Sequence, residues 1–181
     1  MNDQTLSENT TDAVLGQEFL TWLWFHGETA PAGFKDSKGR PFLLTLGQKV
    51  VVQGGEGEMR ETTAVNGGMT DGSHLPLREA RLGLLMGKKV TRALLHLEQE
   101  ELHWQVSIKA DDFSMGSFRT PKIESDSDDD SEALFLEKMY VLEKGLALFD
   151  AAYNTFLALR LSNDDWAHEV HEIGLWMSRK E

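Results

Sequence analysis

The 181-residue sequence contains no cysteine, which excludes disulfide bonds and thiolate metal sites. No apolar run approaches the roughly 20 residues that a membrane-spanning helix needs. Basic residues are scarce, because 18 Lys and Arg stand against 30 Asp and Glu, for a net charge of -12. This balance argues against indiscriminate attraction to DNA or anionic membranes. Residues 1–12 show no cationic start followed by an apolar run, so the sequence predicts a cytoplasmic protein without a secretory signal.

The composition is otherwise that of a globular protein. Hydrophobic residues make up 40% of the chain and charged residues 27%, and the length suffices for one domain with a sizeable core. The charge is uneven along the sequence: the net charge is -5 over residues 1–75, +2 over 76–122 and -9 over 123–181. A contact with a polyanion would therefore be expected in the middle block.

The spacing of apolar residues predicts an α+β fold with a mainly antiparallel sheet of five to six strands. We expect a disordered tail at residues 1–12, a single domain over 13–162 and a terminal helix within 163–181. Gly47 and Gln48 are expected to form a two-residue hairpin turn, and Gly87 to end a middle helix. The expected elements are a short aromatic helix at 14–26, strands at 42–46, 49–53, 60–65, 90–97, 102–109 and 114–119, and a middle helix at 76–86.

The longest predicted element is a helix over about 132–161, which follows an acidic linker at 123–131. Apolar residues recur in it at spacings of four and three over three heptads. At 1.5 Å per residue such a helix is roughly 45 Å long, which is more than one small sheet can cover. We therefore expect part of it to pack on a second helix or a second subunit. The candidate oligomer interface is Phe135, Met139, Leu142, Leu146, Phe149, Tyr153 and Phe156.

Two stretches contain residues whose spacing partly matches that of metal ligands: an acidic stretch from Asp126 to Glu137 and a histidine-containing stretch from His168 to Glu172. In the first, the calcium-loop pattern requires glycine at the sixth position, where the sequence has Ser131, so an acidic helix start is the better interpretation. In the second, the two histidines are three residues apart rather than four, which favours a polar helix surface over a zinc site. No metal site is predicted. The residues concerned are Asp126, Asp128, Asp130 and Glu137 in the first stretch and His168, His171 and Glu172 in the second.

Sequence motifs of catalysis are absent. The glycine-rich stretches at 54–57 and 67–68 do not follow the phosphate-loop patterns and predict turns. There is no G-x-S-x-G motif and no assignable nucleophile with a base. The aromatic residues, which could stack on single-stranded bases, mostly occupy core positions of periodic elements. The sequence therefore predicts a protein that is not an enzyme and needs no cofactor.

The most basic stretch of the sequence is residues 78–92, in which five cations accompany only Glu79. Such a cluster is typical of a modest phosphate-binding surface. On the cations alone, capping is the better interpretation, since lysines at the end of a helix satisfy its last carbonyl groups. The candidate DNA-binding residues are Arg78, Arg81, Lys88, Lys89 and Arg92.

Five blocks of the sequence resemble the RdgC-like proteins of bacteria, which are recombination-associated, nucleoid-type DNA-binding proteins. The distinctive block is GQEFLTWLWF, and the others are short. They occur in the family's order over about residues 14–162, and they are GQEFLTWLWF (16–25), GKKVT (87–91), FLEKMYVLE (135–143), LFD (148–150) and FLALRLS (156–162).

The resemblance implies a ring-shaped homodimer that encloses duplex DNA without sequence specificity and restrains RecA-driven strand exchange. It covers only the carboxy-terminal half of the longer family members, so a separate amino-terminal half is a further expected partner. Some members are named exonucleases, but the sequence offers no nuclease carboxylate cluster. Weak, non-specific contact with duplex DNA at the nucleoid is the leading hypothesis, and no membrane contact is expected. The alternative is an assembly module that uses the long helix and does not bind DNA.

Overall fold

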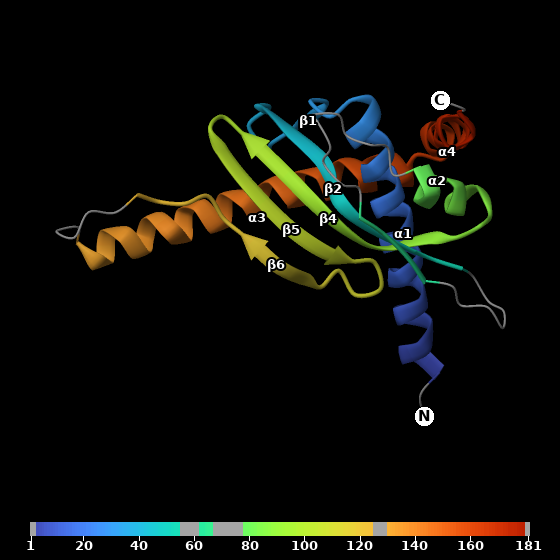
Figure 1. Cartoon of the computed structure of the whole chain (residues 1–181), viewed down its shortest axis with the longest axis horizontal. Coiled ribbons are helices and arrows are strands. Elements are labelled where there is room, and N and C mark those ends of the chain that lie inside the picture. Colours follow the sequence, from blue (N-terminus) through green and yellow to red (C-terminus); the bar gives the residue numbers. More distant parts are fainter. Residues whose placement is uncertain (1–2, 55–61, 67–77, 125–129, 180–181) are drawn as a thin grey trace.

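The computed structural model describes residues 3–54, 62–66, 78–124 and 130–179. In these ranges the chain forms an α+β fold of four helices and one antiparallel sheet of six strands, as the sequence predicts (Figure 1). None of the described helices is long and apolar enough to cross a membrane. In chain order the elements are α1 (Asp3–Thr29), β1 (Phe34–Lys35), β2 (Pro41–Gln53), β3 (Thr62–Asn66), α2 (Arg78–Leu85), β4 (Lys89–Gln99), β5 (Leu102–Lys109), β6 (Met115–Arg119), α3 (Ser131–Leu161) and α4 (Asn163–Ser178).

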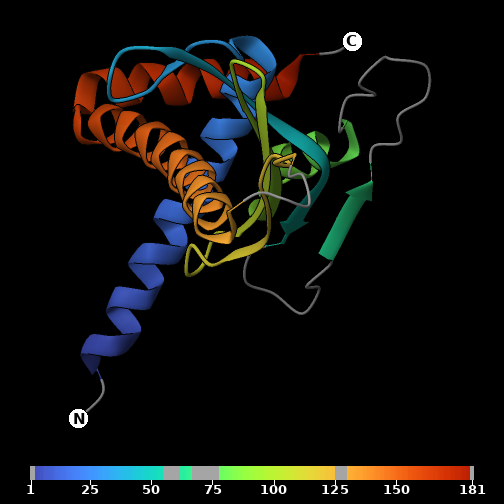
Figure 2. The ribbon, with the colours of Figure 1, turned by 90° about the vertical axis from the view of Figure 1, so that its left-hand side faces the viewer.

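The sheet has the strand order β1-β2-β4-β5-β6, and β3 pairs with the carboxyl end of β2, whereas β1 pairs with its amino end. Its centre is the pair β4 and β5, whose register runs from Arg92 opposite Lys109 to Gln99 opposite Leu102. Side chains alternate between the two faces of these strands, so one face is buried and the other is exposed. Helices α1, α3 and α4 lie on one side of the sheet (Figure 2). The core is therefore a single layer between these helices and the sheet.

Gly47 does not form the predicted turn, and the hairpin expected at Gly47 and Gln48 is wrong. β2 continues through these residues as one strand, with a register irregularity between Leu46 and Val50. A Cβ atom on Gly47 would lie 2.5 Å from Nε2 of His96 on the neighbouring β4. Gly47 thus leaves room for the His96 side chain at this irregularity in the strand pairing, and its φ is not positive. Gly87 does end α2 as predicted, with φ of 84°.

Helix α1 is longer than predicted, because it begins at Asp3 rather than near residue 14. Residues 3–12 were expected to be a disordered tail, but they continue the helix. Neither proline nor glycine occurs between residues 3 and 15, and extending an existing helix avoids the cost of nucleation. Further along, Phe19, Leu20, Trp22, Leu23 and Trp24 are all buried, so α1 is covered on nearly every side.

Helices α3 and α4 form a pair that closes the core. Asp130 caps α3, because its carboxylate accepts a hydrogen bond from the backbone N–H of Glu132. Gly145 of α3 passes directly over Trp104 of β5, whose indole Nε1 donates to the carbonyl oxygen of Val141 at 2.9 Å. The bounds of α3 agree with the predicted 132–161 to within one residue, and α4 lies within the predicted range 163–181.

Candidate nucleic-acid interface

The face of the sheet opposite α1, α3 and α4 is polar and solvent-exposed. Along β4, Ala93, Leu95 and Leu97 point into the core, whereas Arg92, His96 and Glu98 point outward and are exposed. β5 alternates in the same way, so that Trp104, Val106 and Ile108 are buried. An antiparallel sheet with one packed face commonly leaves its other face to water. We call this exposed surface the open face.

Exposed cations lie on the open face along four neighbouring strands, and we call one residue from each of these strands the sheet-face cations. Arg92 of β4 lies directly opposite Lys109 of β5 in the register. Arg119 of β6 pairs with the outward Gln105 of β5, and Lys49 precedes the inward, fully buried Val50 on β2. All four are exposed. The sheet-face cations are Lys49, Arg92, Lys109 and Arg119.

Acidic groups near this set lie toward its rim. Glu98 is paired with His103 at 3.3 Å, between Oε2 and Nδ1, near the β4–β5 turn. Asp112, in the turn between β5 and β6, has a lowered pKa because Ser114 donates hydrogen bonds to its carboxylate and Lys109 is nearby. The Arg92–Lys109 pair itself opposes two like charges across the strands, an arrangement that destabilises a sheet unless an anion lies between them.

The structure separates the five predicted DNA-binding residues. Arg81 is buried, with Nη1 3.6 Å from Oε2 of Glu28 and its guanidinium 5.8 Å from the ring centre of Trp176. It therefore belongs to the core and is not part of an exposed patch. Arg78 begins α2. Lys88 is half-buried and Lys89 exposed where α2 gives way to β4. Of the five, Arg92 lies on the open face beside Lys109, and Lys89, which precedes the buried Val90 on β4, also faces outward.

The signal in the sequence that indicates an outward Lys109 is the regular alternation of β5. That pattern places Lys109 on the outward face, but the register that sets it beside Arg92 depends on pairing between strands. Arg119 lies on the edge strand β6 and reaches the same face only because β6 pairs with β5.

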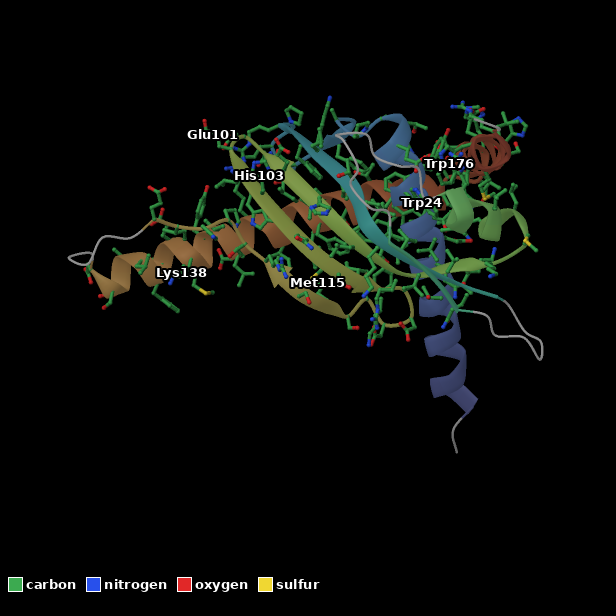
Figure 3. The ribbon with its side chains drawn as sticks, in the orientation of Figure 1. Trp24, Glu101, His103, Met115, Lys138 and Trp176 are labelled. Atoms are coloured by element: carbon green, nitrogen blue, oxygen red, sulfur yellow. The ribbon has the colours of Figure 1, made fainter. Side chains whose placement is uncertain are left out.

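Two carboxylates, those of Glu28 and Glu169, link α1 and α4 by accepting hydrogen bonds from tryptophan side chains. Glu28 accepts hydrogen bonds from Nε1 of Trp24 at 2.6 Å and from Nε1 of Trp176 at 2.8 Å. Trp24 and Trp176 lie close together in Figure 3. Glu169 of α4 accepts hydrogen bonds from Nε1 of Trp22 at 2.9 Å and from Nε2 of His26. Each carboxylate satisfies indole N–H groups at the edge of the core, so these clusters position helices.

The two stretches with partial metal spacing take different places. Asp130 serves as the cap of α3, whereas Asp126 and Asp128 lie outside the described residues. His168 and His171 are exposed on α4, while Glu172 is half-buried. Over the ranges that the structure describes, no group of three or more His, Asp or Glu side chains is arranged to hold a metal ion.

The predicted oligomer seam of α3 is divided between core and surface. Phe149 and Phe156 are buried, with ring centres 5.7 and 5.2 Å from that of Phe19. Tyr153 packs edge-on against the same Phe19 ring at 5.0 Å. Leu142 and Leu146 are half-buried, whereas Phe135 and Met139 are exposed. The carboxyl half of the seam is thus intramolecular, and only its amino end is open to a partner.

The chain matches no protein-family model, and no similar protein is found among curated proteins or solved structures.

Proposed function

We propose that this protein contacts the backbone of duplex DNA without reading its sequence, through the sheet-face cations. The carrying observation is the opposition of Arg92 and Lys109 on the open face. Phosphate oxygens between these side chains would relieve the repulsion and form charge-assisted hydrogen bonds. The resemblance to RdgC-like proteins supports a further part of the proposal: a non-enzymatic role at the nucleoid that modulates RecA-dependent recombination.

The side chains around the cations favour phosphate contact over stacking on bases. The outward residues nearest to Arg92 and Lys109 are Val51, Leu94 and Ser107, which have no aromatic rings. Proteins that hold single strands rely on aromatic platforms, each worth about 1–3 kcal/mol per stacked base. Contacts to phosphate position a protein on a duplex but carry no direct sequence information.

The net charge of -12 limits the strength of this contact. Repulsion between the acidic protein and DNA is screened beyond a Debye length of roughly 8 Å at physiological salt. Four phosphate contacts would give a slope of log K against log salt of about -3.6. We therefore expect weak binding that is measurable at low salt, and tighter binding if a basic partner half is supplied.

Charge reversal on the open face tests the proposal. Fluorescence anisotropy with a short labelled duplex at low salt would compare wild type with Arg92→Glu/Lys109→Glu. The matched control is Lys38→Glu/Arg179→Glu, which changes the net charge equally but lies in the β1–β2 turn and after α4. We expect the open-face variant to lose at least tenfold in affinity and the control to lose much less. Equal losses would show that only net charge matters, and the proposal would be wrong.

The non-enzymatic part needs its own assay. The same duplex and a single strand, incubated with the protein and Mg²⁺ or Mn²⁺, should remain intact. Degradation that co-purifies with the protein and disappears when its own carboxylates are substituted would establish a nuclease instead.

A second candidate function is assembly without DNA contact. It is favoured by the exposed apolar side chains at the amino end of α3, among them Phe135 and Leu136, each 60% exposed, and Met139, which is 38% exposed. Failure of the anisotropy test together with self-association would make assembly the better conclusion. A homodimer and a complex with a separate amino-terminal half are the two partners proposed for it.

A further inference from the structure

The amino-terminal turns of α3 extend past the end of the sheet, and Lys138 is labelled on them in Figure 3 (see also Figure 1). We call residues 131–140 the overhang. Phe135 and Leu136 are each 60% exposed there, and Met139 is 38% exposed. Large apolar side chains gathered on a projecting helix mark a site of protein contact more often than an ordinary surface.

The exposed apolar residues lie beside the face that the core uses, because the buried residues of α3 also include Val141, Gly145, Leu148 and Ala152 on one flank of the heptad seam. Phe135, Met139 and Leu142 follow the same four-and-three spacing as Phe149 and Phe156, which pack against α1. In heptad terms Phe135 and Leu142 occupy d positions and Met139 occupies an a position. A stripe of this period is complementary to another helix, so the overhang has the pattern of half a coiled coil.

The folded body limits how far such a pairing can extend. Gly145, a g position, lies against Trp104, since a Cβ atom there would be 2.6 Å from the indole Cδ1. Val141 is also buried against the sheet. A partner helix can therefore run alongside residues 131–144 and no further, which gives about two heptads.

Charges beside the stripe distinguish the possible partners and orientations. Lys138 occupies a g position and Glu143 the e position five residues later, and both are exposed. In a parallel pair of identical helices, g of one chain faces the following e of the other, so Lys138 would meet Glu143 of the second copy twice. An antiparallel pair sets like flanks together, which opposes lysine to lysine.

We propose that residues 131–144 of α3 pair in parallel and in register with the same segment of a second copy of this chain. This contact is independent of the proposed DNA contact, which uses the other face of the sheet. Stable dimers bury about 1,200–2,000 Å² in total. A two-heptad contact is smaller, so we expect a dissociation constant on the order of 10–100 μM.

Sedimentation equilibrium over roughly 5–500 μM, a span set around the expected dissociation constant, measures the association. Met139→Glu should make the protein monomeric, because the charge would lie in the seam. Tyr140→Glu is the matched control, since Tyr140 is more exposed at 61% but occupies an outer b position. It should leave the dimer within about twofold of wild type. Both sites are exposed, so folding should persist, which circular dichroism would verify.

Substitutions of Lys138 and Glu143 test whether the partner is a second copy of the chain and whether the two helices are parallel. Lys138→Glu and Glu143→Lys should each weaken the dimer by roughly fourfold, and the double variant should restore it. The absence of cysteine allows a second readout: Met139→Cys should form an intermolecular disulfide on oxidation, and Tyr140→Cys should not.

Four outcomes would overturn the inference: a wild type that is monomeric at the highest concentration, equal effects of Met139→Glu and Tyr140→Glu, a double variant without recovery, or no disulfide through Met139→Cys. DNA affinity is measured separately on the same variants, and a monomeric variant that still binds duplex would separate the two proposals.

Discussion

The two faces of the sheet have different chemistry although they are built from the same strands. On β5, Trp104 is buried under α3 and hydrogen-bonded to Val141, while the next residue, Gln105, faces outward. The helix-covered face holds the tryptophans and phenylalanines of the core. The open face holds polar side chains and the sheet-face cations. The contrast indicates that stability is concentrated on one face, which leaves the other free to bind a partner.

The largest expected effect sharpens this contrast within one strand. Trp104→Ala would remove a buried indole and leave a cavity beneath Gly145, at a cost of about 3–5 kcal/mol in the free energy of unfolding. Gln105→Ala, one residue later on the open face, should change it by less than about 0.5 kcal/mol. Urea unfolding of both variants checks the comparison. Similar losses from the two substitutions would mean that the open face is also packed.

An intermediate effect is expected where the covered face is fastened at its edge. Glu28→Ala would leave the indole N–H groups of Trp24 and Trp176 without this acceptor, and it would remove one ion-pair partner of the buried Arg81. We expect a loss of about 2 kcal/mol in the free energy of unfolding. Glu137→Ala, on the exposed overhang, is the control and should be nearly neutral. If Glu28→Ala left the free energy of unfolding unchanged, water would be replacing the carboxylate as hydrogen-bond acceptor without loss of stability.

A smaller effect is expected at the end of the sheet, where Asp36 joins the β1–β2 turn to β4. Burial opposes its ionisation, but hydrogen bonds from Arg40, Gln99 and Lys38 lower the pKa of Asp36 from 3.8 to about 2. A lowered folded-state pKa stabilises the protein above the unfolded pKa, and this stabilisation is lost as the pH falls through about 2.

Asp36→Asn should therefore be less stable than wild type at neutral pH. The difference should narrow as the pH falls from about 4 to about 2. Thermal unfolding at a series of pH values measures this convergence. A constant difference across that range would exclude ionised Asp36 as its source.

The local pattern predicts β5 with the bounds that the structure has, because its strict alternation reports burial directly. The sequence does not distinguish Gly47 from a glycine in a turn, because the His96 side chain for which it leaves room lies on another strand. Arg81 was assigned to an exposed patch because its partners, Glu28 and Trp176, are distant in sequence. In each case the deciding contact joins separate elements.

The candidate site was predicted only in part, for the same reason. Arg92 was identified from a local cluster of cations, but Lys109 joins it through the β4–β5 register. The seam of α3 was visible as a heptad repeat. Its division into a buried carboxyl half and an exposed overhang depends on where Trp104 meets Gly145.

Salt dependence of duplex binding tests the function of the open face most directly. Arg92→Gln/Lys109→Gln removes two charges without adding bulk to the core, and its thermal unfolding midpoint should stay within about 2 °C of wild type. The slope of log K against log salt should become shallower by about 1.8, which corresponds to two lost phosphate contacts. Equal slopes for the variant and wild type would contradict the assignment of DNA contact to this face.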